Sequence, residues 1–250
     1  MKRQLWIGTL TKHYAPPWPC PACAKGILAM VPKSLVFKET ERSKRNSSQE
    51  DWYPELTDYA FTAWLKCGQS SCGQEVVISG NGGLEPADDG EGGMTWSDYF
   101  APRYCYPMPD IIEMPQKCPK EVKIELRGAF ALFWADPGAA AGRLRVALER
   151  LMDNLGVQKR RKGKNGKVLD LSLHQRIELF QRRQPAAGTQ LMALKWLGNA
   201  GSHEGAVSRK DLLDALEILE HSLAELIDRR TVKVAALAKA LTKKHAQRRR

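Results

Sequence analysis

The chain has 250 residues, of which 43% are hydrophobic and 27% charged, a composition typical of a folded globular protein. No apolar run approaches the roughly 20 residues that a membrane helix needs, and no apolar segment of a secretory signal follows Lys2 and Arg3. Six cysteines are too few for a disulfide scaffold and favour a reducing compartment. We therefore expect a cytoplasmic protein without membrane contact.

The positive charge is concentrated in the second half of the chain. Residues 1–118 carry 12 basic and 14 acidic residues, a net charge of −2, whereas residues 119–250 carry 27 basic and 14 acidic residues, a net charge of +13. Together they give the formal net charge of +11. Such an excess favours contact with a polyanion such as nucleic acid, and a solvated surface is the alternative interpretation.

Residues 1–103 are predicted to form a β module. Short apolar runs at 27–31, 35–37 and 76–78 are separated by glycines, prolines and polar residues, which is typical of short strands. The charged passage 39–51 and the glycine-rich passage 80–93 are expected to be exposed loops. Residues 104–118 are rich in proline and are expected to form an extended connector.

Two cysteine pairs are the clearest local signal in this half. Cys20 and Cys23 are separated by two residues, and Cys67 and Cys72 are separated by four, with glycines beside each pair that allow tight turns. Structural zinc sites usually take two thiolates from each of two such turns. We expect one structural zinc ion on these four residues and a zinc-ribbon-like module around it.

Other interpretations of the cysteines stay open. A redox pair would lack its usual βαβ context and would leave the second pair unexplained, and four buried thiols are also conceivable. Cys105 and Cys118 have no matched partners and are expected to be buried apolar residues. His13 is a weaker alternative ligand because four cysteines already complete the shell.

After residue 119 the apolar residues recur with the period of a helix. Five helices are predicted over residues 119–228, which together form an antiparallel bundle. The predicted helices are 122–136, 136–156, 171–183, 186–197 with an end at Gly198, and one after Ser208, whose spacing to Asp211 resembles a capping box. Two loops, 157–169 and 198–208, interrupt them. The fold class is therefore α+β, a zinc-ribbon-like module followed by an all-α bundle.

The segment from Lys195 to His203 combines small residues with an amide and an imidazole. Asn199 and His203 are four residues apart and would face the same way on a helix. A histidine beside an amide and a cation is the minimum set for metal-independent RNA cleavage. The alternative is that Gly198 and Asn199 cap a helix and that His203 is structural.

The stretch 129–228 resembles the bacterial family of domains of unknown function DUF4145, a branch related to HEPN domains. The resemblance is carried by Asp136–Ala141, Arg143–Leu151, Leu173–Ile177, Leu194–His203 and Asp211–His221. Members with a cysteine-pair ribbon also resemble the rest of this chain. The resemblance implies an all-α bundle that is often a homodimer, is found in bacterial defence or conflict systems, and has a largely unassigned function.

HEPN ribonucleases carry an arginine a few residues before the histidine, whereas this chain has Gly198 there. Lys195 or Arg150 could replace that cation. The resemblance therefore implies nucleic-acid association, RNA rather than DNA, and an endoribonuclease with His203, Asn199 and a cation as catalytic residues. The alternative is a non-catalytic zinc-containing adaptor that dimerises and docks a partner protein.

Two basic segments are candidates for phosphate contact, the loop 159–167 and the C-terminal segment 229–250, which we expect to form a basic helix or tail. Neither contains an aromatic residue, so base stacking is not expected from them. The candidate residues are Lys159, Arg160, Arg161, Lys162, Lys164, Lys167, Lys243, Lys244, Arg248, Arg249 and Arg250.

Overall fold

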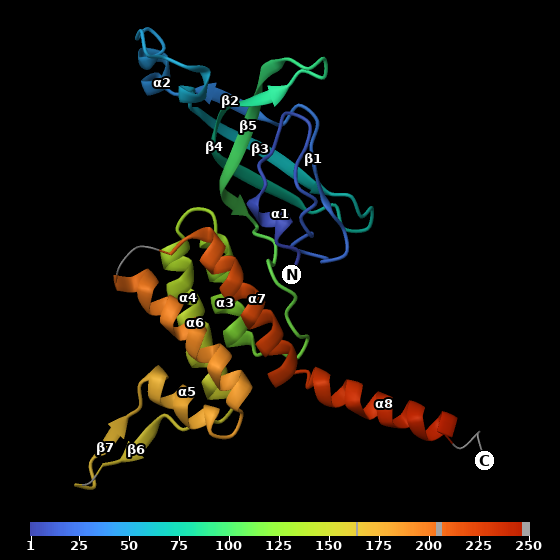
Figure 1. The fold of residues 1–250 in the computed structure, drawn as a ribbon, viewed down its shortest axis with the longest axis vertical. Coiled ribbons are helices and arrows are strands. Elements are labelled where there is room, and N and C mark those ends of the chain that lie inside the picture. Colours follow the sequence, from blue (N-terminus) through green and yellow to red (C-terminus); the bar gives the residue numbers. More distant parts are fainter. Residues whose placement is uncertain (164, 204–206, 247–250) are drawn as a thin grey trace. The chain divides into compact units, whose positions relative to one another are not determined.

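A computed structural model describes residues 1–163, 165–203 and 207–246, except for the side chains of residues 202, 203 and 246 (Figure 1). The chain divides into two compact units. The first contains residues 2–111 and 130–136, and the second contains Met1, residues 112–129 and the chain from Pro137 onward. The protein is thus a mixed α+β structure with an N-terminal sheet and C-terminal helices.

The first unit is built on an antiparallel sheet in which β1 and β2 both pair with β3, and β4 connects β3 to β5. β1 lies along the C-terminal end of β3 and β2 along its N-terminal end. The strands are β1 (Leu28–Met30), β2 (Val36–Glu39), β3 (Tyr59–Cys67), β4 (Glu75–Asp88) and β5 (Met94–Tyr106). A cis peptide bond joins Tyr106 to Pro107 immediately after β5.

The core of this sheet follows from the alternation of residues along β3. Phe61, Ala63 and Leu65 are buried and the residues between them are exposed, as expected for a strand with one face in the core. Phe61 packs on the fully buried Phe100 of β5, with ring centroids 5.3 Å apart. Burial of these aromatic and aliphatic side chains is the main stabilising contribution to the sheet.

An aromatic cluster completes the first unit. Trp6, from the short helix α1 (Gln4–Ile7), lies against Trp18, Phe133 and Trp134. The ring centroids of Trp18 and Trp134 are 5.2 Å apart, and all four residues are buried. The residues just after the first long helix, 133 and 134, therefore belong to the core of the first unit, which explains why residues 130–136 group with it.

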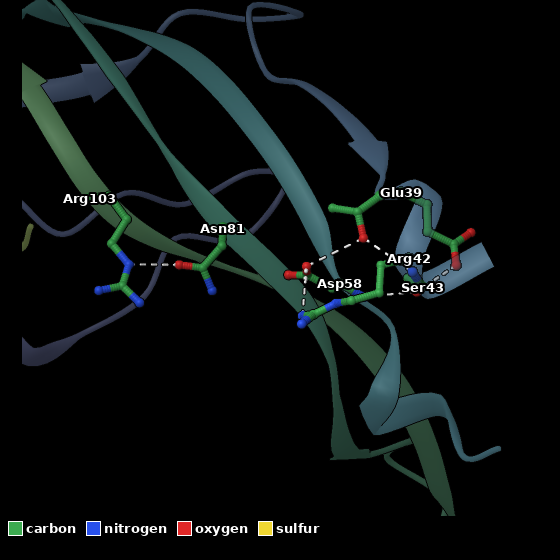
Figure 2. Close-up of polar contacts among 7 residues, drawn as sticks. Glu39, Arg42, Ser43, Asp58, Asn81 and Arg103 are labelled. Atoms are coloured by element: carbon green, nitrogen blue, oxygen red, sulfur yellow. Dashed lines mark hydrogen bonds and ion pairs between the residues drawn. The ribbon is translucent and has the colours of Figure 1, made fainter. Parts of the chain in front are cut away.

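The prediction of an exposed loop over 39–51 is partly wrong, because residues 41–46 form helix α2 (Glu41–Asn46). Figure 2 shows the contacts that hold it. The buried Ser43 hydroxyl donates to Glu39 at 2.7 Å and accepts the backbone N–H of Asp58 at 3.1 Å, while Arg42 pairs with Asp58 at 3.7 Å. A short 3-10 helix, η1 (Pro54–Leu56), follows.

The prediction of a loop over 80–93 is wrong for residues 80–88, which continue β4 to Asp88. Glycines normally weaken strands, but here they are needed. A Cβ atom at Gly82 would collide with the backbone oxygen of Tyr99, and one at Gly80 would collide with that of Ala101. The glycines thus permit the close approach of β5, and the turn itself is confined to residues 89–93.

The second unit is helical, with α6 at its centre in contact with α4, α5 and α7. Leucines of α4 and α7, together with Leu191 and Leu194 of α6, are buried among these helices. The helices are α3 (Lys120–Leu132), α4 (Pro137–Asn154), α5 (Leu173–Gln181), α6 (Pro185–His203), α7 (Arg209–Leu226) and α8 (Arg230–Ala246). The last residues of α3 belong to the first unit.

The start of α7 confirms the capping prediction. The Ser208 hydroxyl accepts the backbone N–H of Asp211 at 3.1 Å, and the Asp211 carboxylate accepts the backbone N–H of Ser208 at 3.0 Å. These reciprocal bonds satisfy N–H groups that a helix start leaves without partners. Ser172 and Gln175 form the same arrangement at the start of α5.

Two predictions about loops in this half are wrong. The fourth helix does not end at Gly198, because α6 continues to His203. The loop 157–169 contains a two-stranded hairpin of β6 (Arg160–Lys162) and β7 (Val168–Asp170). In the described parts of the chain, no helix combines the length and apolar character needed to span a membrane.

The continuation of α6 past Gly198 has a packing cause. A Cβ atom at Gly198 would lie 2.7 Å from Cβ of Arg145 and 3.1 Å from the backbone oxygen of Ala141, both on α4. A Cβ atom at Gly201 would lie 3.1 Å from Cβ of Ala141. The two glycines let the backbones of α4 and α6 approach, and this packing offsets the roughly 1 kcal/mol that a glycine costs a helix.

We predict that Gly198→Ala lowers the free energy of unfolding by about 1–3 kcal/mol, because the new methyl group has no room against α4. Helix propensity alone predicts the opposite sign. Gly128→Ala is the matched control, since its nearest new neighbour, Arg143, would be at 3.5 Å. That control is expected to be neutral or stabilising by up to about 1 kcal/mol. Urea denaturation of both variants decides the matter, and a stabilised Gly198→Ala protein would contradict the packing argument.

Candidate functional site

The four cysteines of the two sequence pairs converge in the first unit. The sulfur atoms of Cys20, Cys23, Cys67 and Cys72 all lie within 4.8 Å of one another. Cys20 and Cys72 are 3.7 Å apart between sulfurs, and Cys23 and Cys67 are 3.8 Å apart. All four are free thiols rather than disulfides. This cluster can hold a metal ion.

The spacing fits a tetrahedral thiolate site. A tetrahedron with metal–sulfur bonds of about 2.3 Å has edges of about 3.8 Å, close to the two shortest sulfur separations. Backbone N–H groups also point at the sulfurs, from Gly26 to Cys23 at 3.3 Å and from Gln69 to Cys67 at 3.4 Å. Such hydrogen bonds favour the negatively charged form of sulfur, which is the form that binds metal.

Local sequence explains why the two turns meet. Leu28 of β1 pairs with Cys67 at the end of β3, so the strand pairing brings the second turn beside the first. The residue at position 26 must be glycine, because a Cβ atom there would collide with the Cys67 sulfur. Gly73 adopts φ +61°, which lets the second turn close after Cys72. Gly68 has ordinary space around it and is not required in this way.

The pKa values of two of these thiols are shifted in opposite directions. Hydrogen bonds from the Gly26 and Lys25 N–H groups lower the pKa of Cys23 to about 6. At Cys67 the Gln69 N–H lowers the pKa, but burial and hydrogen bonds with the other three cysteines outweigh it and raise the pKa to about 12. One thiolate therefore forms easily and further thiolates are disfavoured beside it. A cation at the centre of the cluster would remove that repulsion.

The remaining cysteines lie outside the cluster. Cys105 and Cys118 are both buried, as expected for apolar residues, and burial raises the pKa of the Cys105 thiol to about 12. A thiol with so high a pKa is a poor nucleophile and a poor metal ligand at neutral pH. His13, the weaker alternative ligand, is exposed and is not part of the cluster.

The predicted catalytic residues lie on two helices. Arg150 is on α4, and no ion pair or hydrogen bond among the described side chains joins it to Lys195 or Asn199 of α6. Lys195 is only 7% exposed, and its ammonium nitrogen lies 3.4 Å from the ring centroid of Trp196. Asn199 is half-buried. His203 closes the last turn of α6, and its side chain lies outside the described residues, so its catalytic role stays a prediction.

The structure explains why position 198 holds glycine rather than the arginine that the HEPN resemblance leads one to expect. Any side chain there would run into the side chain of Arg145 and the backbone of α4. The same contact places Arg145 of α4 next to the segment from Lys195 to His203. Its Cδ would be 3.5 Å from a Cβ atom at Gly198. Arg145 therefore supplies a cation beside this segment from the facing helix, which sequence spacing along one helix does not reveal.

Arg150 lines a cavity of about 330 Å³ between α4, the hairpin and the start of α5. Arg145, Lys159 and Arg176 also line it, as do Glu149, Asp153 and Asp170. The buried Arg176 donates to Asp153 at 2.8 Å and to the backbone oxygen of Val157 at 3.0 Å, and Lys159 pairs with Asp153 at 2.9 Å. Two of the four cations of this cavity thus share one carboxylate, that of Asp153.

The basic segments are exposed and differ in structure. β6 carries Arg160, Arg161 and Lys162, of which Arg160 pairs with Asp170 at 2.8 Å. Lys167 is exposed between the strands. Lys243 and Lys244 lie in the last turn of α8. Lys164 and Arg248, Arg249 and Arg250 lie outside the described residues.

Sequence reasoning missed Arg145 and Arg176, which reach the same cavity as Arg150. Arg145 is four residues before Glu149 and pairs with it at 3.4 Å. This spacing, typical of an ion pair on a helix, was the signal available in the sequence.

Sequence reasoning also missed three exposed aromatic residues on the sheet, Trp64, Tyr104 and Tyr106. Their signal was the alternation of β3 and β5, in which buried and exposed positions succeed one another.

Comparison with known families finds matches for both halves of the chain. Residues 8–105 match a family described as domain of unknown function DUF8608, and residues 127–244 match the domain of unknown function DUF4145. The second match confirms the resemblance expected from the motifs of the helical half. No curated protein and no solved structure matches the chain.

We predict that Asp153→Asn destabilises the helical unit by about 1–3 kcal/mol at neutral pH, because it leaves the buried Arg176 without its charged partner. Partial burial raises the pKa of Asp153, but hydrogen bonds from Lys159 and Arg176 outweigh it and hold that pKa below 3.8. A lowered carboxyl pKa stabilises the fold above the unfolded-state pKa, and this contribution is lost as the pH falls below it.

The stability difference between wild type and Asp153→Asn should therefore shrink as the pH falls below 3.8 in urea denaturation. Asp170→Asn is the matched control, because it breaks only the exposed pair with Arg160, in which the side chains are 80% and 70% exposed. Its expected effect is between zero and about 1 kcal/mol. Equal stability of the two variants at neutral pH would contradict the assignment.

Proposed function

We propose that this protein binds nucleic acid through phosphate contacts made by its helical half. The family that matches residues 127–244, DUF4145, is a domain of unknown function, so the proposal rests on the site itself. The net charge of +13 over residues 119–250 supports the proposal, since a polyanion releases counterions when such a surface neutralises its phosphates. We expect RNA rather than DNA, and a role in bacterial defence, from the HEPN resemblance.

One observation carries the proposal, the exposed hairpin of β6 and β7. Every residue of both strands is exposed. Arg161, Lys162 and Lys167 have no acidic partner among the described residues, unlike Lys159 and Arg160. Successive strand residues point to opposite faces, so Arg161 and Lys162 present cations on both sides of the ribbon. A narrow, exposed basic ribbon of this kind suits the grooves and backbone of a nucleic acid.

Helix α8 provides a second basic element. It has four lysines and Arg230 but no acidic residue, and it is exposed along its described length. Long lysine side chains on a helix of this kind can follow a phosphate backbone without reading sequence. Together with the hairpin, the helix favours affinity that depends on charge rather than on base identity.

The metal of the cysteine cluster is proposed to be zinc. Four thiolates in a tetrahedron are the ligand set of structural zinc sites, and hard cations such as magnesium prefer oxygen ligands. Bound to all four cysteines, the ion would have no open position for a substrate. It would therefore hold the two turns together, in keeping with a structural role in a ribbon-like module.

An adaptor function is the second candidate, and the apolar side of α8 favours it. Val234, Leu237 and Leu241 recur at helical spacing and are 57%, 65% and 60% exposed. Exposed apolar stripes of this kind mark surfaces that contact another macromolecule. The lysines of the same helix would repel a second copy, so this surface favours an acidic partner protein over pairing of α8 with itself.

We predict that replacing Arg161, Lys162 and Lys167 by glutamine weakens nucleic-acid binding and lowers its salt dependence. Each lost phosphate contact removes about 0.7–0.9 from the slope of log K against log salt, so the slope should fall by about 2–3. Fluorescence anisotropy with labelled RNA and DNA duplexes over a salt series measures this.

The control replaces three exposed cations elsewhere, Lys33, Arg45 and Lys117, by glutamine. This variant has the same net charge as the hairpin variant but should keep most of the wild-type slope. Wild-type binding that does not respond to salt would refute the proposal. Equal losses in both triple variants would show that only net charge matters and would refute the role of the hairpin.

We predict one zinc ion per chain, with loss of the metal in Cys23→Ser and in Cys67→Ser. Elemental analysis of purified protein gives the stoichiometry. Loss of one thiolate should unfold the sheet unit, since metal binding contributes directly to the folding of small metal sites. Cys118→Ser lies outside the cluster and should keep the zinc. A protein that purifies without stoichiometric metal under metal-replete conditions would refute the prediction.

A further inference from the structure

The exposed face of the sheet carries a group of aromatic residues on β3 and β5, the strands on either side of β4. Trp64 of β3 pairs with Val77 of β4, which pairs in turn with Tyr106 of β5. Ser79, two residues along β4, pairs with Tyr104. Paired residues share a face, and Trp64, Tyr104 and Tyr106 are 48%, 63% and 77% exposed. We refer to these three residues as the aromatic sheet face.

The strand geometry spaces these residues regularly. Tyr104 and Tyr106 lie on one side of the same strand, about 6.8 Å apart, and Trp64 lies two strands away, at about 9.6 Å from Tyr106. The first spacing is about twice the 3.4 Å rise of stacked bases. Adjacent bases of a flexible strand can therefore each reach a ring, which the stiff base stack of a duplex cannot do.

The charges around the aromatic sheet face are mainly basic, although the N-terminal half has a net charge of −2 over residues 1–118. Lys38 of β2 and Lys66 of β3 lie at exposed positions of this face, opposite Ala60 and Ala29. Two acidic residues lie beside these positions, and both have cationic partners: Glu75 pairs with Lys66 at 3.5 Å, and Asp58, just before β3, pairs with Arg42 at 3.7 Å. The net charge around the aromatic sheet face is therefore positive, whereas the net charge of residues 1–118 as a whole is negative.

A strand irregularity brings one more cation to this face. The register of β4 and β5 shifts between Ser79 and Gly80, so Arg103 is the extra residue between Tyr104 and Pro102. Arg103 Nε donates to the Asn81 side-chain oxygen at 2.9 Å (Figure 2). Asn81 in turn pairs with the exposed Ala60 of β3. Arg103 is therefore held beside the tyrosines, with the rest of its guanidinium available to a phosphate.

We propose that the aromatic sheet face binds single-stranded nucleic acid, with bases stacked on Trp64, Tyr104 and Tyr106 and the backbone contacted by Lys38 and Arg103. Exposed aromatic rings on one face of a sheet, flanked by cations, are the combination that sequence-tolerant single-strand binding requires. The proposal rests on the proposed function and deepens it, because it names single strands as the ligand of the sheet unit. The basic hairpin acts on phosphates of any strand, whereas this face requires unpaired bases.

The test replaces Trp64 and Tyr106 by threonine, which keeps strand propensity and removes the rings. Fluorescence anisotropy follows binding of labelled oligouridylate, labelled oligothymidylate and a labelled DNA duplex. Each lost ring should weaken binding of the single strands about 5- to 100-fold and leave duplex binding unchanged. Trp64→Phe and Tyr106→Phe should restore single-strand binding, since phenylalanine keeps the stacking surface. The two single strands separate RNA from DNA as the preferred ligand.

Tyr14→Thr and Tyr53→Thr are matched controls, because both tyrosines are exposed but lie outside the strands. They should bind single strands as wild type does, and unchanged circular dichroism shows that all variants are folded. If the Trp64 and Tyr106 threonine variants bind single strands as tightly as wild type, the proposal is overturned and the proposed function is left intact. That result is expected if this face docks a protein instead. A wild-type protein that binds duplex alone also overturns it. Binding to neither ligand overturns the proposed function as well.

Discussion

The close approach of α6 to α4 is the constraint on which the helical unit depends. α6 contacts α4, α5 and α7, so its position sets the core of the unit. The approach is possible because positions 198 and 201 have no side chain, and a Cβ atom at either would meet α4. These two glycines, which the sequence predicted to lie in the loop 198–208, are therefore packing residues within a helix. Helix α6 continues through them because packing against α4 offsets the free energy that glycines cost a helix.

This constraint also decides which cations stand near the segment that ends at His203. Arginine cannot occupy position 198, and the basic side chain in contact with that position is Arg145 of the facing helix, which pairs with Glu149 at 3.4 Å. Lys195 is buried, with its ammonium over the ring of Trp196. Such a cation–π contact is stronger when the cation is shielded from water. A lysine held in this way is poorly placed to follow a phosphate. Within the helical unit, the exposed cations of the proposed nucleic-acid surface therefore lie on the hairpin and on α8 rather than along the face of α6.

Several parts of the fold could be predicted from the sequence because their causes are local. The capping box at Ser208 and the helical leucine stripe of α7 depend on spacings of three and four residues, and both are present. The two cysteine pairs also carry their own turns, so their meeting required only the antiparallel pairing of Leu28 with Cys67. The family of the helical half was predictable for the same reason, since its motifs are short and continuous.

Other parts could not be predicted because their causes are distant in the sequence. The glycines of β4 indicate a loop until β5 is known to lie against Gly80 and Gly82. The hairpin at 160–170 has no apolar alternation, and it forms through backbone pairing between strands of charged and exposed residues. The extra residue Arg103 follows from a register shift that no local pattern specifies.

The two halves of the chain would also act on a nucleic acid by different physical means. Cations on the hairpin and α8 act through long-range attraction, which salt weakens because it lowers the gain from counterion release. Stacking on Trp64 and Tyr106 depends on contact area and is largely insensitive to salt. A single strand held by stacking would keep part of its affinity at high salt, whereas a duplex held by cations alone would be released. Preference for single over double strands should therefore rise with salt, although each affinity falls. This dependence follows from the separation of aromatic residues and most of the basic residues into different units.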